Sequence, residues 1–597
     1  MADAMEGEKS MPTKIPHWRQ VTDPGAVTPE IVNYPYPGSG TEEDPYLVQW
    51  IPNDPRNPMN YSAVKKWSIT FVVAIATLAV ALISSAYTGG AIEIAQEFHA
   101  DAEIITLGVS LFVLGFAIGP LIWAPMSELF GRQLLFFGTY LALTAFNAGA
   151  AGSPNMATLL VLRFFAGSFG SSPLTNAGGV IADMFPASHR GLAMGIFAIA
   201  PFLGPVLGPV IGGFLGESAG WRWVEGFLAI FSGVVWIIGS IFLPETYPPV
   251  LLRKRAQRLS TLTGKVYTSR MDVEQGKLSI GQAFKTALMR PWILLFREPI
   301  VLLLSTYMAI VYGTLYMLFS AFPVVYQQHR GWSPGIGGLA FLGVLGGILA
   351  AMVVNLLDNK RYTKVSKEHN GFAPPEERLP VAIIGGIAIP IGLFWFAWTN
   401  GPQIHWIVSI IASAPFGFGM VLVFLSLMNY LIDAYTIYAA SVLAANSVLR
   451  SLFGAAFPLF TRYMYQNLGI HWASTIPAFL ALACVPFPFL FYRYGASIRK
   501  RCKFAGEADA FMQKLMQANS AHLESDSVVS EAGPLSRRSS LEVREIAGAG
   551  IDRVQSARSG LTRTRTAATI EYEGNPYDID RVNTGLSRVS TTKSHRR

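Results

Sequence analysis

The feature that most constrains this 597-residue chain is a series of apolar stretches, each long enough to form a membrane-spanning helix. A helix needs about 20 mostly apolar residues to cross the roughly 30 Å hydrocarbon core of a bilayer. Twelve stretches meet this requirement, near residues 67–87, 104–124, 134–152, 157–181, 190–215, 223–243, 299–322, 336–356, 379–399, 403–427, 437–461 and 473–492. Only 14% of the residues are charged, whereas soluble domains carry about 25%. The sequence therefore predicts an all-α integral membrane protein with twelve transmembrane helices.

The positions of Lys and Arg in the connections predict how these helices are oriented. The connections near 88–103, 153–155 and 400–402 contain no Lys or Arg, whereas the central connection, 244–298, contains ten. Basic residues also follow the eighth and the last apolar stretches. Because basic loops remain on the cytosolic side of a membrane, we expect the even-numbered connections and both termini to lie in the cytosol.

These boundaries divide the chain into five predicted regions. They are a cytosolic, mostly disordered N-terminal segment (1–66), an N-terminal six-helix half (67–243), a cytosolic central loop (244–298), a C-terminal six-helix half (299–492) and a basic, largely disordered cytosolic tail (493–597). The tail is predicted to be disordered because it is polar and rich in Ser and Thr. A basic pair before Ser539 and Ser540 is typical of a protein kinase site, although such pairs also arise by chance in solvated tails.

Acidic and basic residues recur at matching places in the two halves. Asp183 ends the fourth stretch and Asp433 ends the tenth, while Glu128 and Arg132, after the second stretch, have a degraded counterpart at 358–361. Repeats of this kind occur in transporters that rock one half against the other around a central site. The sequence therefore predicts two parallel six-helix repeats.

The fifth stretch contains a nested pattern of small residues and prolines. Small residues four positions apart let helices approach closely, and a proline bends the helix that contains it. A single pair of this kind is usually a packing face, but the complete pattern resembles the antiporter motif of the major facilitator superfamily. Its members here are Gly195, Gly204, Gly208, Pro209, Gly212 and Gly213.

The loop after the second stretch is a candidate gate. Glu128 and Arg132 flank Gly131, so a carboxylate and a guanidinium could close the gate by an ion pair and by contacts with helix ends. A turn with solvated charges is the alternative. The loop resembles the superfamily's signature between helices two and three, with Glu128 in place of the usual Asp.

Two arginines lie inside apolar stretches, Arg163 in the fourth and Arg450 in the eleventh. An arginine at the centre of a membrane helix costs about 2.5–3.5 kcal/mol, so each should face a partner or water. The alternatives are an Arg163 that extends to the membrane edge and an Arg450 anchored to Asp433 or a helix end. By resemblance, Arg163 is the arginine linked to proton transfer. The residues expected to act in proton coupling and gating are Arg163, Glu128, Gly131, Arg132, Asp183, Arg190, Asp433 and Arg450.

A substrate site is expected near the membrane midplane between the halves, where aromatic side chains are plentiful. Apolar ligands are held mainly by such surfaces together with a few polar groups. For each aromatic residue, packing in the core or contact with lipid is the alternative. The candidates are Phe112, Phe116, Tyr312, Tyr316, Phe319, Phe416, Phe424, Asn429, Tyr430 and Asn446.

The resemblance narrows further with Pro244-Glu245-Thr246 after the sixth stretch and the segment 171–179, which look like fungal twelve-span drug:proton antiporters. The resemblance implies the major facilitator fold and proton-coupled export, by alternating access, of hydrophobic or amphipathic molecules such as azole-type drugs or fungal secondary metabolites. It implies no cofactor beyond the proton gradient, and a monomer in the plasma membrane or the vacuolar membrane.

Other functions remain open at this point. The main alternatives are a proton symporter or facilitator that imports a nutrient, a polyamine exporter, and a receptor that keeps the fold. An enzyme is not predicted, because the sequence shows no nucleophile–base pair, metal cluster or phosphate-binding loop. We likewise expect no bound metal and no nucleic-acid partner.

Overall fold

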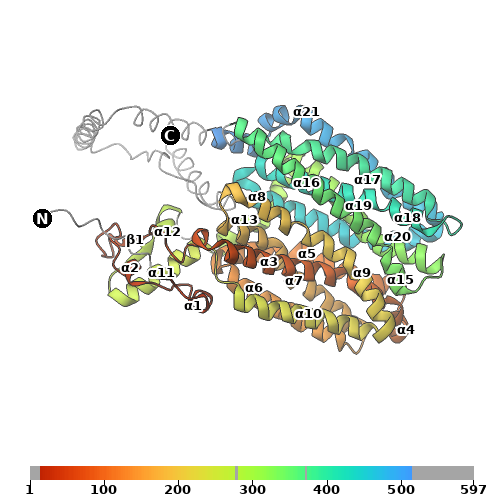
Figure 1. The fold of residues 1–597 in the computed structure, drawn as a ribbon, viewed down its shortest axis with the longest axis horizontal. Helices are drawn as coiled ribbons and strands as arrows, with labels where there is room; N and C mark the ends of the chain where they lie inside the picture. Colours follow the sequence, from red (N-terminus) through yellow and green to blue (C-terminus); the bar gives the residue numbers. More distant parts are fainter. Residues whose placement is uncertain (1–13, 276–279, 370–372, 514–597) are drawn as a thin grey trace, which may run out of the picture.

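The computed structural model describes residues 14–275, 280–369 and 373–513, which form an elongated helical bundle with a smaller unit at one end (Figure 1). The N-terminal half consists of α3 (Ala63–Ala86), the short α4 (Ala91–Phe98), α5 (Ala102–Phe130), α6 (Arg132–Ala151), α7 (Met156–Met184), α8 (Ala187–Phe197), α9 (Ala200–Ala219) and α10 (Trp221–Phe242). The predicted fifth span is divided between α8 and α9, just before the proline-containing segment.

The C-terminal half repeats this arrangement. It consists of α14 (Pro299–Phe322), α15 (Pro334–Leu339), α16 (Leu342–Glu368), α17 (Leu379–Thr399), α18 (Trp406–Ala412), α19 (Ala414–Ala434), α20 (Ala439–Cys484) and α21 (Pro486–Arg501). The two halves lie side by side in Figure 1, in red to yellow and in green to blue. They contact each other mainly where α5 packs on α20 and where α9 packs on α15.

Length and hydropathy identify ten candidate spans among the described residues, two fewer than the sequence predicts. One difference is α7, where Arg163 and several Gly and Ser residues lower the hydropathy of a 29-residue helix. The other is the candidate Thr436–Arg501, which covers two predicted spans. Within it, Gly469 has a φ of 71° and interrupts α20. Helices thus cover all twelve predicted stretches, although hydropathy alone supports ten.

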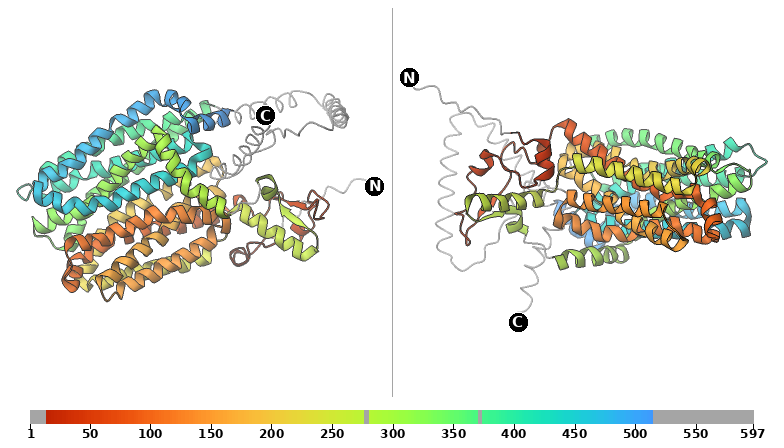
Figure 2. Two further views of the ribbon diagram at one scale, coloured as in Figure 1. Left: turned by 180° about the vertical axis from the view of Figure 1, so that it is seen from behind. Right: turned by 90° about the horizontal axis from the view of Figure 1, so that it is seen from below.

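The smaller unit joins the N-terminal segment to the central loop. The N-terminal segment contributes α1 (His17–Thr22), α2 (Pro29–Val32) and β1 (Tyr46–Val48). The central loop contributes α11 (Pro248–Thr263), β2 (Tyr267–Ser269) and α12 (Arg270–Gln275). After α12, α13 (Ile280–Arg297) leads back to the bundle. The strands β1 and β2 pair in parallel, with Tyr46 opposite Tyr267. Both views in Figure 2 place this unit at one end of the bundle.

The prediction that residues 1–66 are mostly disordered is wrong for the described part, 14–66. Both carboxylate oxygens of Asp54 accept hydrogen bonds from the Arg255 guanidinium, at 2.6 and 3.0 Å, and both side chains are fully buried. The order of this segment depends on a partner about 200 residues away, which local composition cannot reveal.

The predicted disordered tail also begins later than expected. Helix α21 continues to Arg501, and the Arg499 guanidinium pairs with Glu376 at 2.9 Å. Residues 514–597, with the candidate kinase site at Ser539 and Ser540, lie outside the described residues.

Candidate functional site

Arg163 lies in the third turn of α7 and is completely buried. Its guanidinium donates hydrogen bonds to the carbonyl oxygens of Ile83 (3.2 Å), Ser84 (3.4 Å) and Gly108 (3.2 Å), which belong to α3 and α5. It also lies over the rings of two aromatic residues, Tyr87 at 4.7 Å and Phe112 at 4.6 Å. The alternative in which Arg163 extends to the membrane edge is therefore wrong.

The carboxylate partner of Arg163 is Glu225, which the sequence reasoning missed. One Glu225 oxygen lies 3.4 Å from the Arg163 guanidinium, and the side chain is 1% exposed. The other oxygen, Oε2, is buried without a hydrogen-bond partner among the described residues. Glu225 is the fifth residue of α10, so an acid in the first two turns of a predicted span was the available signal. The pair links α7 to α10, and the unpaired oxygen can accept a proton.

The predicted gate loop forms at the junction of α5 and α6. Gly131 has a φ of 100°, a conformation that favours glycine. Arg132 pairs with Asp183 at 3.5 Å and donates a hydrogen bond to Ser127 at 2.7 Å. The structure therefore brings Gly131, Arg132 and Asp183 together, and Glu128 lies half-buried in the last turn of α5.

Glu245 holds this junction to the end of α10, a role that the sequence reasoning did not assign. Its carboxylate accepts hydrogen bonds from the backbone N–H groups of Arg132 (3.0 Å) and Gln133 (3.1 Å), at the start of α6. It also accepts hydrogen bonds from Thr246 and Tyr247. A carboxylate at a helix N-terminus is favoured by the helix dipole, so Glu245 fixes the gate loop to the segment that leads into α11.

The remaining predicted coupling residues lie apart from Arg163. Arg190 is in α8, where its guanidinium donates hydrogen bonds to the carbonyl oxygens of Ala182 and Phe185, both at 3.3 Å. Asp433 pairs with Arg378 at 2.9 Å and accepts a hydrogen bond from Tyr362 at 3.1 Å.

The glycines of the fifth span serve two different interfaces. A Cβ at Gly204 would lie 2.6 Å from the Ala81 Cβ, and one at Gly208 or Gly212 would overlap Ser85 or Ala86, so these glycines let α9 approach α3.

The opposite face of α9 approaches the other half. There a Cβ at Gly213 would lie 2.6 Å from the Pro334 carbonyl oxygen, and a Cβ at Gly338 would overlap the carbonyl oxygen of Pro209. Gly195 is different, because nothing lies within 4 Å of a Cβ placed there.

Five of the predicted substrate residues form one cluster between the halves. The Arg450 guanidinium lies over the Tyr312 ring (4.8 Å) and the Phe424 ring (5.0 Å). The Tyr312 hydroxyl donates a hydrogen bond to that of Tyr316. Phe319 packs on Tyr316 at 5.2 Å, and Asn446 lies one turn before Arg450 on α20. The alternative in which Arg450 is anchored to Asp433 is wrong, because no carboxylate within the described residues pairs with Arg450 and Asp433 pairs with Arg378.

The other predicted substrate residues lie elsewhere. Phe112 and Phe116 stack on each other at 5.2 Å, with Phe112 against Arg163. Phe416 is buried where α19 packs on α17. Asn429 and Tyr430 lie in the last two turns of α19, and the Tyr430 hydroxyl faces Gly495 of α21.

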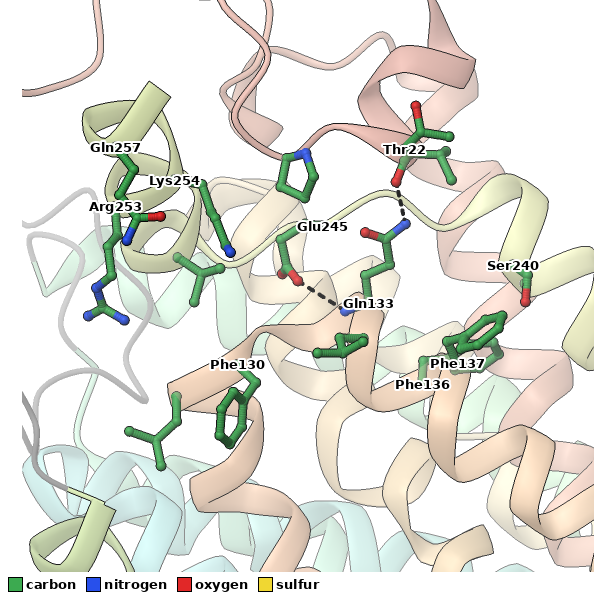
Figure 3. A pocket seen from close by; sticks show the side chains of 16 residues that line it. Thr22, Phe130, Gln133, Phe136, Phe137, Ser240, Glu245, Arg253, Lys254 and Gln257 are labelled. Carbon is green, nitrogen blue, oxygen red and sulfur yellow. Dashed lines mark hydrogen bonds between the residues drawn. The ribbon is translucent and has the colours of Figure 1, made fainter. Parts of the chain in front are cut away.

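A cavity of about 440 Å³ lies away from this cluster, where the smaller unit meets α5, α6 and α10 (Figure 3). Its wall is aromatic at Phe130, Phe136 and Phe137, and Lys254 and Glu245 point toward its interior. It lies at the end of the N-terminal half rather than between the halves, so it does not match the site expected for a transported molecule.

Comparisons with known proteins agree with this architecture. Residues 70–458 match the sequence profile of the Major Facilitator Superfamily. The chain is 95% identical over 596 residues to the MFS-type efflux pump MFS2 of Trichophyton rubrum, covering 100% of both chains. It is 64% identical to the major facilitator superfamily multidrug transporter mdrA of Aspergillus fumigatus, covering 98% of each.

Among solved structures, the proton:xylose symporter XylE superposes with a TM-score of 0.53 at 16% identity. The match covers 73% of this chain and 96% of that one. At this identity the likeness concerns the fold alone.

Proposed function

The chain belongs to the major facilitator superfamily and is a membrane transporter, and from this premise we propose that it exports hydrophobic or amphipathic small molecules in exchange for protons. Drugs of the azole type and fungal secondary metabolites are the substrate classes. The names of its relatives, an efflux pump and a multidrug transporter, support export. The observation that carries proton coupling is the buried Arg163–Glu225 pair.

The coupling follows from the charges in this pair. An ionised Glu225 balances Arg163 inside an apolar bundle, where an unpaired charge is costly. A proton on Glu225 removes the attraction and leaves Arg163 held by carbonyl oxygens of α3 and α5. Because α3 also packs on the glycines of α9, the protonation state of Glu225 can shift the balance between two arrangements of these helices.

We further propose that the protein is a monomer in the plasma membrane, with both termini in the cytosol. The excess of basic residues in the even-numbered connections supports the cytosolic position of the termini. The vacuolar membrane is the alternative location.

Two alternative functions, nutrient import and polyamine export, are less well supported. Nutrient import does not account for the complete antiporter pattern, which extends over α8 and α9. A polyamine exporter would need carboxylates near its positively charged substrate. In the aromatic cluster between the halves, the charged residue beside the Tyr312 and Phe424 rings is instead Arg450.

The test is retention of labelled compounds in a transporter-depleted yeast that expresses the chain. The panel contains an azole, a polyamine and a fungal metabolite, each measured with and without a protonophore. We expect lower retention of the azole or the metabolite, and loss of this effect with the protonophore. Unchanged retention of every compound, with increased uptake of a nutrient, would contradict export.

A further inference from the structure

Arg450 is a membrane-embedded arginine whose charge no residue in the described ranges neutralises. Its side chain is partly buried, and its Nε atom is fully buried without a hydrogen-bond partner in those ranges. Its guanidinium lies against the faces of Tyr312 and Phe424. Ring faces attract a cation, but they accept no hydrogen bonds comparable to those of a carboxylate.

Arg163 in the other half is a buried arginine whose charge and hydrogen-bond donors do have partners. Three carbonyl oxygens and the Glu225 carboxylate surround its guanidinium, and no part of it is exposed. Among the described residues, Arg450 has neither a carboxylate partner nor carbonyl oxygens around its guanidinium. Because an arginine in an apolar span is costly, its charge and its five N–H donors favour an anionic partner.

The surroundings of Arg450 indicate the chemistry of that partner. Along α20, Asn446 contacts the sulfur atoms of Met308 (3.2 Å) and Met428 (3.4 Å), and one turn later Arg450 lies between Tyr312 and Phe424. The facing residues thus change from thioethers to aromatic rings along α14 and α19. Thioethers are weak acceptors, and the Asn446 Oδ1 atom has no partner among the described residues. Apolar and aromatic surfaces beside a cationic group favour a mostly apolar, aromatic molecule with one anionic end.

The cluster also connects the two halves. The Phe424 ring packs at 5.1 Å on Phe202 of α9, and the Tyr316 hydroxyl lies 2.9 Å from the Ser84 hydroxyl of α3. A ligand bound at Arg450 therefore lies against residues of both repeats, as a transported molecule must.

We propose that Arg450 binds the anionic group, a carboxylate or an ionised phenol, of an aromatic organic acid that this transporter carries. The rings of Tyr312 and Phe424 hold the aromatic body, and the guanidinium donates hydrogen bonds to the anionic oxygens. The idea that the ligand is transported rests on the proposed export function, but its binding at Arg450 does not.

The test compares two probes that share the naphthalene ring and differ in the terminal group, the carboxylate of 1-naphthaleneacetate and the neutral amide of 1-naphthaleneacetamide. Their dissociation constants are measured at pH 7.4 with the purified full-length protein in lipid nanodiscs. The wild type should bind the acid at least about tenfold more tightly than the amide, since a hydrogen bond to a charged group contributes that much. In Arg450→Gln the two dissociation constants should become nearly equal, chiefly through weaker binding of the acid.

Two variants serve as controls. Arg450→Lys keeps the charge but loses the planar fork, and should retain part of the preference for the acid. Arg462→Gln removes a positive charge twelve positions further along the chain, outside the cluster, and should keep the full preference.

Three results would overturn the proposal. The wild type could fail to bind the acid, or it could bind acid and amide with nearly equal dissociation constants. Arg450→Gln could also weaken the binding of both probes by the same factor. The yeast retention assay, which uses other compounds, tests export separately. If the wild type prefers the acid but shows no proton-driven export in yeast, the binding result would support the anion site and the export result would refute the proposed function.

Discussion

At the scale of single residues, two arginines in equivalent halves have different surroundings. Arg163 is paired with a carboxylate, and Arg450 lies between aromatic rings. The sequence located both arginines, because a charge in an apolar stretch is conspicuous. It did not reveal the partner of Arg163, since Glu225 and Arg163 are 62 positions apart and meet only when α7 packs near α10. One of the alternatives for Arg450, an anchor to Asp433, is wrong because Asp433 pairs with Arg378.

Replacing Glu225 with Gln tests the proton site directly. The amide keeps the size of the side chain but cannot gain or lose a proton, so efflux should fall at least about tenfold, as when a residue positioned for proton transfer is removed. Substrate binding should change little. The measurements are efflux from loaded yeast cells at several external pH values and the amount of protein at the cell surface.

The residual efflux of this variant should not vary with external pH. Glu103→Gln is the matched control, because Glu103 is an acidic residue in the first turn of α5 and forms no ion pair with Arg163 among the described residues. A Glu225→Gln protein with the normal pH dependence would remove Glu225 from the coupling mechanism.

At the scale of helices, the sequence predicted where each helix lies along the chain far better than which neighbours each helix face contacts. Apolar length placed α14 and α17 at their observed limits, 299–322 and 379–399. The pattern of glycines indicated that α9 packs closely, but not that its two faces serve α3 and α15 separately. That division depends on how the helices are rotated, which is fixed only by their neighbours.

The glycines of the fifth span give a prediction at this scale. Gly208→Ala places a methyl group against Ser85, with backbone atoms of Ala86 and Leu82 at 2.8 and 2.9 Å, so α9 must move away from α3. Such overpacking costs about 1–3 kcal/mol, and both efflux and the melting temperature should fall. Gly195→Ala is the control, since the same methyl group meets nothing within 4 Å. Equal behaviour of the two variants would show that close packing at Gly208 is dispensable.

The smaller unit supplies a second prediction for an element. Asp54→Asn leaves Arg255 buried without its counter-charge, which costs about 3–5 kcal/mol. The N-terminal segment should then detach from α11 and become sensitive to protease. The Arg253–Asp272 pair should matter less, because Arg253 is 31% exposed and solvent screens its charge, so Asp272→Asn is the matched control. The measurement is limited proteolysis of the two purified variants. Equal protease resistance of Asp54→Asn and Asp272→Asn would contradict docking of the N-terminal segment through Asp54.

At the scale of the whole molecule, the halves meet closely at the end where α9 approaches α15. Gly213 lies against Pro334, and the Glu217 carboxylate accepts a hydrogen bond from the backbone N–H of Gly335 at 3.1 Å. Alternating access requires this contact to open while the opposite end closes. The sequence predicted two rocking halves from the repeated acid–base pairs, but which end is closed in one state depends on three-dimensional packing.

The central claim is that substrate leaves as protons enter, and transport by reconstituted protein tests it most directly. Proteoliposomes with an acidic interior are given the labelled compound that shows the largest efflux in yeast, and protein-free liposomes report its passive distribution. We predict accumulation above the passive level, collapse of that accumulation by a protonophore, and simple equilibration with Glu225→Gln. Accumulation only when the exterior is acidic, or accumulation indifferent to the proton gradient, would contradict proton-coupled export.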